Sequence, residues 1–157
     1  QIKRRSAATI GGSNAIFSVG QNPVTAAYPA VNTTNDIVGL DVSSPLNHTG
    51  YNSGAINLVS GVFSPPTLDK YQVILKIGLK NSVVQGRWIL QLYCITDLQN
   101  VSQSEQWNAN SPNTFQDFYL HDCLILDPAK TYKFRVRDLT TLGISSYANT
   151  TVMLNYA

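Results

Sequence analysis

The 157-residue sequence predicts one all-β domain, built as an antiparallel sandwich or barrel. Only 13% of the residues are charged, and 14 Asn, 14 Ser and 13 Thr supply most of the polarity. Helix surfaces are normally filled with Glu, Lys and Arg, whereas this chain has a single Glu, so long helices are excluded. Short runs in which apolar and polar residues alternate recur between turn signals. With 43% hydrophobic residues, the chain can bury a core without disulfides or metals.

The elements follow in chain order. Residues 1–14 are small, basic and Gly-containing, which predicts a tail or linker before a domain at 15–157. The clearest strand is 71–79, where apolar residues alternate with polar ones over nine positions. Further strands are predicted at 15–19, 37–42, 56–63, 87–94, 118–126, 132–138 and 151–156. Turn signals separate them, among them 47–50 and 52–54, and the polar stretch 97–117 is predicted to be an irregular loop.

Charge is concentrated at the start of the chain, where Lys3, Arg4 and Arg5 lie together. The remainder carries 8 basic and 9 acidic side chains and is nearly neutral. Three cations neutralise too few phosphates for tight binding, so nucleic acid is an unlikely partner and a solvated terminus is the simpler interpretation. No apolar run approaches the roughly 20 residues of a membrane span. The first residue is Gln rather than Met, so we expect a processed chain or a fragment of something longer.

Cys94 and Cys123 are too few for a disulfide framework or a metal site, and each lies in an apolar run typical of buried residues. If 87–94 and 118–126 form a hairpin, its loop centres near residue 106 or 107. The cysteines then stand about four residues apart along the strands, roughly 13 Å, whereas a disulfide needs about 7 Å or less. We therefore predict free thiols. N-glycosylation sequons, close to their chance number, occur at Asn32, Asn47, Asn100 and Asn149.

Catalytic chemistry is not indicated. His48 lies in a turn-rich segment, and His121 is next to Asp122 inside a predicted strand. Adjacent strand residues point to opposite faces, so Asp122 cannot orient His121. Asp36 and Asp41 are candidates for a loop Ca²⁺ site, but they lack a ligand-spacing pattern and no cofactor is expected.

Two features are candidates for ligand binding. Lys133, Arg135 and Arg137 alternate along one strand, so all three point to one face and could bind an anion or an acidic partner. An ordinary solvated face, or one facing a subunit neighbour, is the alternative. Trp107 lies in the predicted loop 97–117, which we expect to contribute to recognition rather than to the fold. Equally, Trp107 could fold back and hold its own loop.

The order of motifs resembles the globular head of the C1q/TNF-like superfamily. The matching segments are 15–19 (AIFSV), 36–41, 50–52, 61–71 with its GxFxxP-like start, 126–136 and 145–156. The chain departs from the family pattern at Asp69, where Gly is usual, and at Ala129 and Lys130, which replace Gly-Asp. No Gly precedes Val152. Asp is tolerated in turns, so these departures leave the resemblance nearly whole-chain.

The resemblance implies a ten-strand jelly roll that forms a homotrimer and binds receptors, glycans or other ligands without catalysis. Carried over to this chain, the trimer contacts are Ile74, Tyr119 and Met153. Ile74 is also the apolar exception on the polar face of 71–79, which independently favours a subunit contact.

Three function classes follow. The first is a recognition head on an extracellular protein or on a viral or phage spike or fibre, which the charge-poor surface favours. The second is a structural coat protein, because capsid subunits are also jelly rolls and often carry basic tails. An enzyme or small-molecule carrier is the third.

Overall fold

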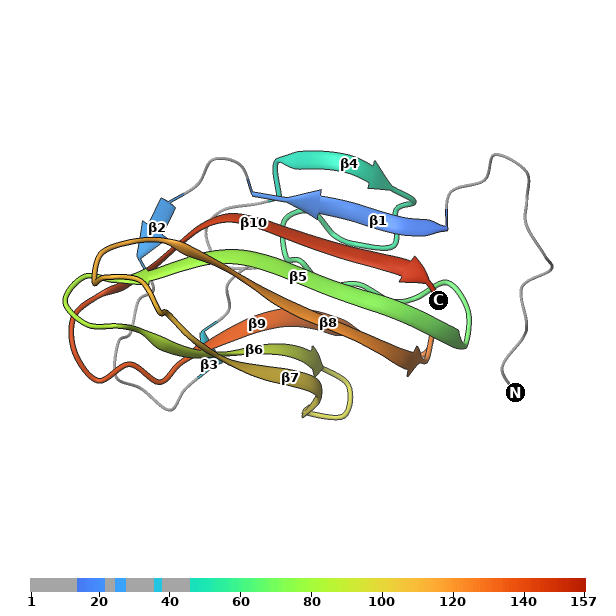
Figure 1. Ribbon diagram of the computed structural model, residues 1–157. Helices are drawn as coiled ribbons and strands as arrows, with labels where there is room; N and C mark the ends of the chain where they lie inside the picture. The colour runs from blue at the N-terminus through green and yellow to red at the C-terminus, as the bar shows by residue number, and fades with distance from the viewer. Residues whose placement is uncertain (1–13, 22–24, 28–35, 38–45) are drawn as a thin grey trace.

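The computed structural model describes residues 14–21, 25–27, 36–37 and 46–157, and all regular structure in these segments is β. Ten strands form two antiparallel sheets that pack as two layers (Figure 1). The six-stranded sheet has the order β4 (His48–Asn52), β1 (Ala15–Gly20), β10 (Ser145–Tyr156), β5 (Asp69–Asn81) and β8 (Gln116–Leu126), with β2 (Thr25–Ala27) also paired to β10. The four-stranded sheet has the order β3 (Asp36–Ile37), β9 (Tyr132–Asp138), β6 (Arg87–Cys94) and β7 (Gln99–Trp107). The predicted antiparallel sandwich is confirmed.

The core lies between the two layers, because each strand turns alternate side chains inward. Phe63, in the segment between β4 and β5, joins the sheets at one point of this core. Its ring stacks on Phe134 of β9 with centroids 5.8 Å apart and meets Phe17 of β1 edge-to-face at 5.1 Å. These pairs have the offset geometries that aromatic rings prefer, so they hold β1 and β9 together across the sandwich.

Trp88 joins the sheets at a second point. It is fully buried on β6, 5.7 Å from the ring of Phe118 on β8. Its indole N–H donates to the hydroxyl of Ser145 on β10 at 3.2 Å, which satisfies the buried donor. A Cβ at Gly86 would overlap the indole ring, so only glycine fits at that turn.

Most predicted strands are confirmed, namely 15–19, 71–79, 87–94, 118–126 and 132–138. The strand predicted at 151–156 is longer and begins at Ser145. Of the one predicted at 37–42, β3 holds Ile37, and 38–45 lie outside the described residues. Residues 1–13 of the predicted tail lie outside them too.

Three sequence predictions are wrong. The stretch 97–117 is not an irregular loop, because β7 occupies 99–107. The turn predicted at 47–50 is mostly strand, because β4 occupies 48–52. The strand predicted at 56–63 is irregular except for isolated bridges from Phe63 to Ile56 and to Tyr132.

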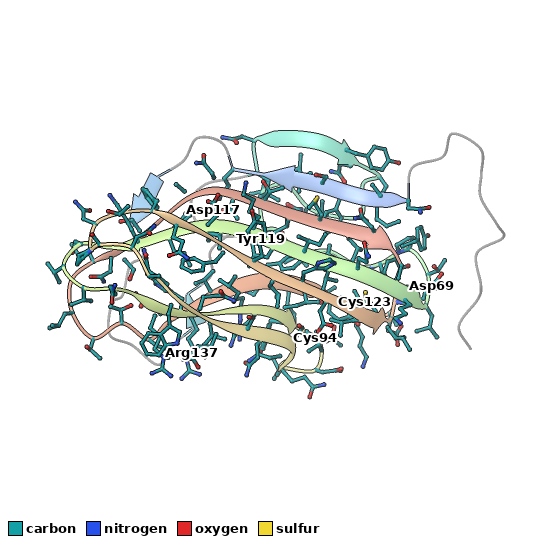
Figure 2. The ribbon with its side chains drawn as sticks, viewed as in Figure 1. Asp69, Cys94, Asp117, Tyr119, Cys123 and Arg137 are labelled. Atoms are coloured by element: carbon teal, nitrogen blue, oxygen red, sulfur yellow. The ribbon has the colours of Figure 1, made fainter. Side chains whose placement is uncertain are left out.

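The predicted hairpin of 87–94 with 118–126 is also wrong. β6 pairs with β7 and β9, whereas β8 pairs with β5 in the other sheet. Cys94 and Cys123 therefore lie in different sheets (Figure 2). Both thiols are free, as predicted. The reason is that the cysteines lie in different sheets, not that they are offset along one hairpin. Cys94 is buried, whereas Cys123 is exposed and does not act as a core residue.

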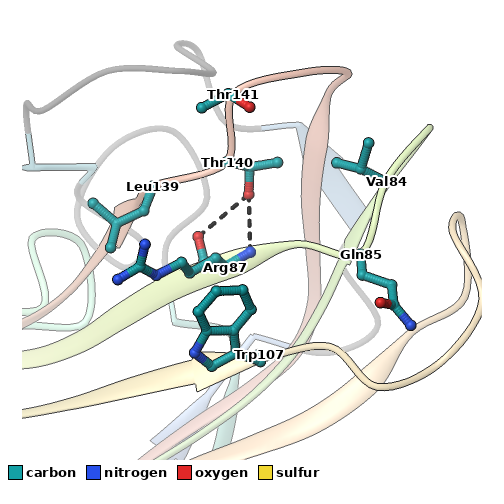
Figure 3. Close-up of a pocket in the computed structure, with 7 residues that line it drawn as sticks. All are labelled: Val84, Gln85, Arg87, Trp107, Leu139, Thr140 and Thr141. Atoms are coloured by element: carbon teal, nitrogen blue, oxygen red, sulfur yellow. Dashed lines mark hydrogen bonds between the residues drawn. The ribbon is translucent and has the colours of Figure 1, made fainter.

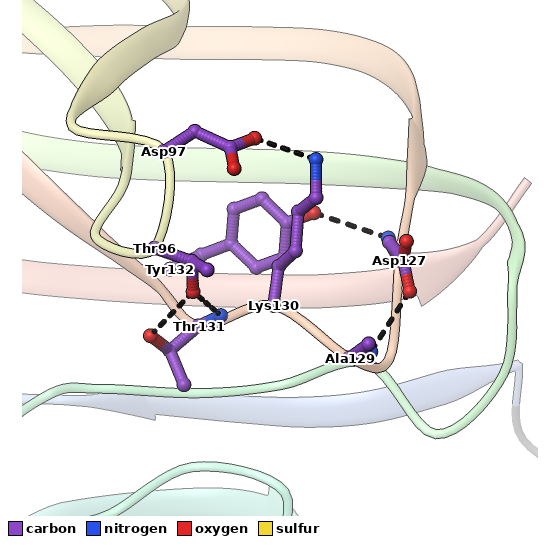
Figure 4. A network of polar contacts seen from close by, with 7 residues as sticks. All are labelled: Thr96, Asp97, Asp127, Ala129, Lys130, Thr131 and Tyr132. Atoms are coloured by element: carbon purple, nitrogen blue, oxygen red, sulfur yellow. Dashed lines mark hydrogen bonds and ion pairs between the residues drawn. The ribbon is translucent and has the colours of Figure 1, made fainter.

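Polar contacts close one end of the four-stranded sheet (Figure 4). Lys130, in the turn between β8 and β9, forms an ion pair with Asp97 in the turn between β6 and β7. Beside it, the backbone N–H of Thr131 donates to the Thr96 hydroxyl at 3.0 Å. The hydrogen bond from Lys130 lowers the pKa of Asp97 and raises that of the ammonium. The two turns are thus held together by one charge-assisted bond and one neutral hydrogen bond.

Candidate functional site

The outer side of the six-stranded sheet, called the large-sheet face below, carries one row of side chains across five strands. Directly opposed residues in antiparallel strands share a face. The register places Tyr51 opposite Ser18, Ser18 opposite Met153, Met153 opposite Ile74, and Ile74 opposite His121. This central row contains no Asp, Glu, Lys or Arg.

The three predicted trimer-contact residues lie together on the large-sheet face. Ile74 and Met153 are directly opposed on β5 and β10. Tyr119 on β8 is opposite Lys76, one row away, and is 54% exposed. Lys76 is 3.9 Å from Asp117, so the charges in this neighbourhood are matched. Figure 2 labels Asp117, Tyr119 and Cys123 along β8.

The outer side of the four-stranded sheet, called the small-sheet face below, is richer in charge. All four predicted ligand-binding residues lie here. Its outward residues with described side chains are Lys133, Arg135 and Arg137 on β9, Arg87, Ile89, Gln91 and Tyr93 on β6, and Asn100, Gln103, Glu105 and Trp107 on β7. Four of these are cations and one is an acid.

Arg135 points to the same face as Lys133 and Arg137, as the alternation predicts, but it is buried. It is only 7% exposed, and its guanidinium lies 3.5 Å from the centroid of the Tyr93 ring. The same group donates to the side-chain oxygens of Gln91 and Asn100, both at 3.2 Å. Arg135 therefore ties β9 to β6 and β7, a structural role. Lys133 and Arg137 are half-buried, and Figure 2 labels Arg137.

Trp107 ends β7 and is 60% exposed, so the hypothesis that it folds back to hold its own loop is wrong. The guanidinium of Arg87, opposite Trp107 in the register, lies 4.7 Å from the indole centroid. Arg87 also forms an ion pair with Glu105. The hydrogen bond from Arg87 lowers the pKa of Glu105, with a smaller contribution from Trp107, and the contact raises the pKa of Arg87. Arg87 and Glu105 are not among the residues that the sequence singles out, because they lie 18 positions apart on different strands.

A pocket of about 260 Å³ lies beside Trp107 (Figure 3). It lies where the β5–β6 turn, the end of β7 and the segment after β9 meet. Its lining residues are Val84, Gln85, Arg87, Trp107, Leu139, Thr140 and Thr141.

The remaining sequence candidates are not gathered into a site. His121 points outward from β8, whereas Asp122 accepts a hydrogen bond from the Ser102 hydroxyl of β7 at 2.8 Å. The prediction that Asp122 does not orient His121 is therefore confirmed. Asp36 begins β3, while Asp41 lies outside the described residues. In the segments that the structure describes, no three His, Cys, Asp or Glu side chains are close enough to hold a metal ion.

Comparison with solved structures gives matches over most of this chain. Eiger TNF from S. frugiperda superposes with a TM-score of 0.56 over 91% of this chain and 92% of that chain, at 14% identity. The globular domain of zebrafish complement 1qA gives 0.51 over 89% and 95%, at 12% identity. The fold is a C1q/TNF-like jelly roll. This confirms the fold that the sequence motifs implied.

A viral chain shares the same architecture. A structure of infectious bursal disease virus, Gx strain, gives a TM-score of 0.51 over 89% of this chain but only 32% of that chain, at 11% identity. No family model matches the sequence, and no curated protein matches it. A helix with the length and apolar character needed to cross a membrane is not found among the described residues.

Proposed function

We propose that this C1q/TNF-like jelly roll is a non-enzymatic recognition domain that assembles as a homotrimer and is displayed outside the cell or on a virion surface. The large-sheet face is the subunit contact, and Ile74, Tyr119 and Met153 lie at its centre. The small-sheet face and the ends of the sandwich remain outside this contact and are available to a receptor, glycan or protein ligand.

The observation that carries the trimer is the central row of the large-sheet face. It runs across five strands without a formally charged side chain, and Tyr119 beside it is more than half exposed. Aromatic and apolar side chains on an outer sheet face are typical of interface cores, in which charged residues are depleted. The motif resemblance points to the same residues independently.

Recognition is favoured over catalysis by the placement of the polar groups. His121 and Asp122 face opposite sides of β8, so they do not form an acid–base pair. The cation-rich small-sheet face and the pocket beside Trp107 have the mixed aromatic and polar character of binding surfaces.

The experiment compares Ile74→Lys with Ile89→Lys by sedimentation. Both residues are half-buried isoleucines in mid-strand, one on each outer face. Three lysines around a threefold axis would lose their hydration, so Ile74→Lys should be monomeric. Ile89 lies on the small-sheet face, between Glu105 and Arg137 and outside the proposed contact, so Ile89→Lys should stay trimeric. A wild-type monomer, or an Ile74→Lys trimer with an unchanged melting temperature, would refute the assignment.

A structural coat protein is the second candidate, favoured by the match to the infectious bursal disease virus chain. Sizing separates the two candidates. A discrete trimer supports the recognition domain, whereas shells or other large assemblies support the coat protein.

A further inference from the structure

The pocket beside Trp107 is built by three segments that are distant in sequence and independently fixed. Figure 3 shows the indole ring beneath Arg87 and Thr140, with Gln85 to one side. The Thr140 hydroxyl accepts from the backbone N–H of Arg87 at 3.0 Å and donates to its carbonyl at 3.2 Å. The backbone N–H of Thr140 in turn donates to the Asp138 carboxylate at 2.8 Å. The segment after β9 is thus fixed against β6.

The position of Trp107 is fixed by the residue that follows it. Asn108 is buried, and its amide donates to the carbonyls of Leu79 at 3.2 Å and Thr114 at 2.9 Å. Its side-chain oxygen accepts from the backbone N–H of Asn110 at 2.8 Å. An exposed indole on an anchored backbone loses little conformational freedom when it binds, which is the property of a preorganised site.

The indole offers a large apolar surface. Arg87 lies 4.7 Å from the ring centroid, yet 60% of Trp107 stays exposed, so much of the side chain remains available to a ligand. Leu139 and Val84 extend this apolar surface along the pocket. The face of an aromatic ring carries a partial negative charge, which attracts the weakly positive C–H groups of a ligand.

The polar groups of the pocket are neutral or already matched. Arg87 and Glu105 form an ion pair, and the pKa of each is shifted toward its charged form by the other, so the pair adds no net charge. The Gln85 amide nitrogen donates to the carbonyls of Ala109 and Asn110 at 3.3 Å, which leaves its oxygen facing no donor within the described segments. The hydroxyl of exposed Thr141 likewise has no partner there. These two groups can bind hydroxyls of a ligand.

We propose that this pocket binds one neutral pyranose unit of a glycan. A pyranose has an apolar C–H face that would pack on the indole, and a rim of hydroxyls that would reach Gln85 and Thr141. The volume of about 260 Å³ is just below the roughly 300–1,000 Å³ of pockets for drug-sized ligands, which suits a single ring. The inference rests on the proposed recognition function and names its ligand class.

The test measures binding of the full chain to an array of glycans that end in neutral hexoses or N-acetylhexosamines, alongside sialylated and sulfated counterparts. At least one neutral terminal sugar should bind. Trp107→Ala should weaken that binding about tenfold or more, and Trp107→Phe should weaken it less, because part of the stacking surface remains. The matched control is Leu142→Ala, because Leu142 is exposed to the same 60% but does not line the pocket. It should bind as wild type does.

Fluorescence gives a second readout. The chain has two tryptophans, and Trp88 is fully buried, so a sugar-induced change in emission should come from Trp107 and vanish in Trp107→Phe. If Trp107→Ala does not fold, Thr141→Val combined with Gln85→Ala tests the hydroxyl contacts instead. This pair should weaken sugar binding while the melting temperature stays within a few degrees of wild type.

Three outcomes overturn the inference: no neutral glycan bound, sugar binding unaffected by Trp107→Ala, or binding confined to acidic glycans. Cell binding separates this failure from failure of the proposed function. If trimers bind cells through Trp107 and binding survives periodate treatment but not protease treatment, the ligand is a protein, and only the sugar inference fails. If the protein is not trimeric and binds no cells, the proposed function itself fails.

Discussion

Ile74 and Ile89 occupy similar places on the two outer faces of the sandwich, but their neighbours differ. Ile74 lies between Met153 and His121, in a row without formal charge. Ile89 lies between Glu105 and Arg137, in a row of opposite charges. The same residue type, half-buried in both places, therefore lies in an uncharged row in one sheet and in an ion-rich row in the other. An apolar residue on a polar face is informative only when its cross-strand neighbours are known.

The largest effect is expected from a substitution in the core between the two sheets, which supports both outer faces. Trp88→Ala deletes the fully buried ring that contacts β8 and β10 from β6. Large-to-small changes of this kind cost about 3–5 kcal/mol of unfolding free energy. Chemical denaturation should show that loss, together with loss of trimer and of ligand binding. Trp107→Ala, at the exposed tryptophan, should change the unfolding free energy by only about 0.5 kcal/mol. Equal losses for the two variants would contradict the packing described for Trp88.

The next effect is confined to the large-sheet face. Tyr119→Ala removes an aromatic side chain that is mostly outside the core, so the stability of a monomer should not fall. Truncating an aromatic residue at the centre of an interface typically weakens association by about 2 kcal/mol, or more than tenfold. Sedimentation at a series of concentrations should show the shift. A variant that dissociates at the same concentration as wild type would place Tyr119 outside the contact.

A smaller effect is expected on the small-sheet face, at Arg135. Arg135→Lys keeps the charge but loses the planar stacking on Tyr93 and one of the bonds to Gln91 and Asn100. We expect a loss of about 1–2 kcal/mol in urea unfolding, with oligomeric state unchanged. The reverse exchange at half-buried Lys133, Lys133→Arg, should stay within about 0.5 kcal/mol. If both exchanges are neutral, Arg135 is not the tie between strands that its contacts indicate.

The smallest effect depends on pH and on the ion pairs of the four-stranded sheet. Asp97 and Glu105 have pKa values lowered by Lys130 and Arg87. A lowered folded-state pKa contributes stability above the unfolded pKa, near 4, that is lost as pH falls through the folded value. Asp97→Asn and Glu105→Gln should therefore each make the fall in melting temperature between about pH 5 and pH 2 shallower. The reference is Asp117→Asn, whose carboxylate lies on the large-sheet face and is half exposed. An unchanged acid slope in both variants would show that these pairs are unformed in solution.

The alternation of apolar and polar residues predicts a strand correctly where the strand buries one face. It fails for a strand with two polar faces and for a buried segment that is not a strand. β5 turns five apolar side chains inward, so its pattern is clear in the sequence. β7 is an edge strand on which polar residues occupy both faces, so its sequence has the composition of a loop. Conversely, Ile56 and Phe63 are buried although their segment forms no strand ladder. A turn that includes the hydrogen bond from Gly61 to Asn57 lies between them. Apolar spacing thus reports burial, not strand pairing.

For the candidate sites too, some features could be predicted from the sequence and others could not. Alternation alone places Ile74 on the outer face of its strand, whereas Met153 was assigned from the family resemblance, and only the register shows that the two are side by side. Trp107 was identified as a candidate, but its pocket could not be predicted. Arg87 and Thr140 reach it from β6 and from the segment after β9, and nothing local in the sequence encodes that meeting.

The central position of β10 sets an order for folding during synthesis. β10 is the last described strand along the chain, yet it lies between β1 and β5 in the middle of the six-stranded sheet. The four-stranded sheet can close once residue 138 has left the ribosome, whereas β1 has no partner on its β10 side until residues 145–156 emerge. Pairing between such distant segments is slow, because a long loop must close first. A nascent chain would therefore complete the pairing of the four-stranded sheet first, and the large-sheet face, which could join neighbouring chains, would form last.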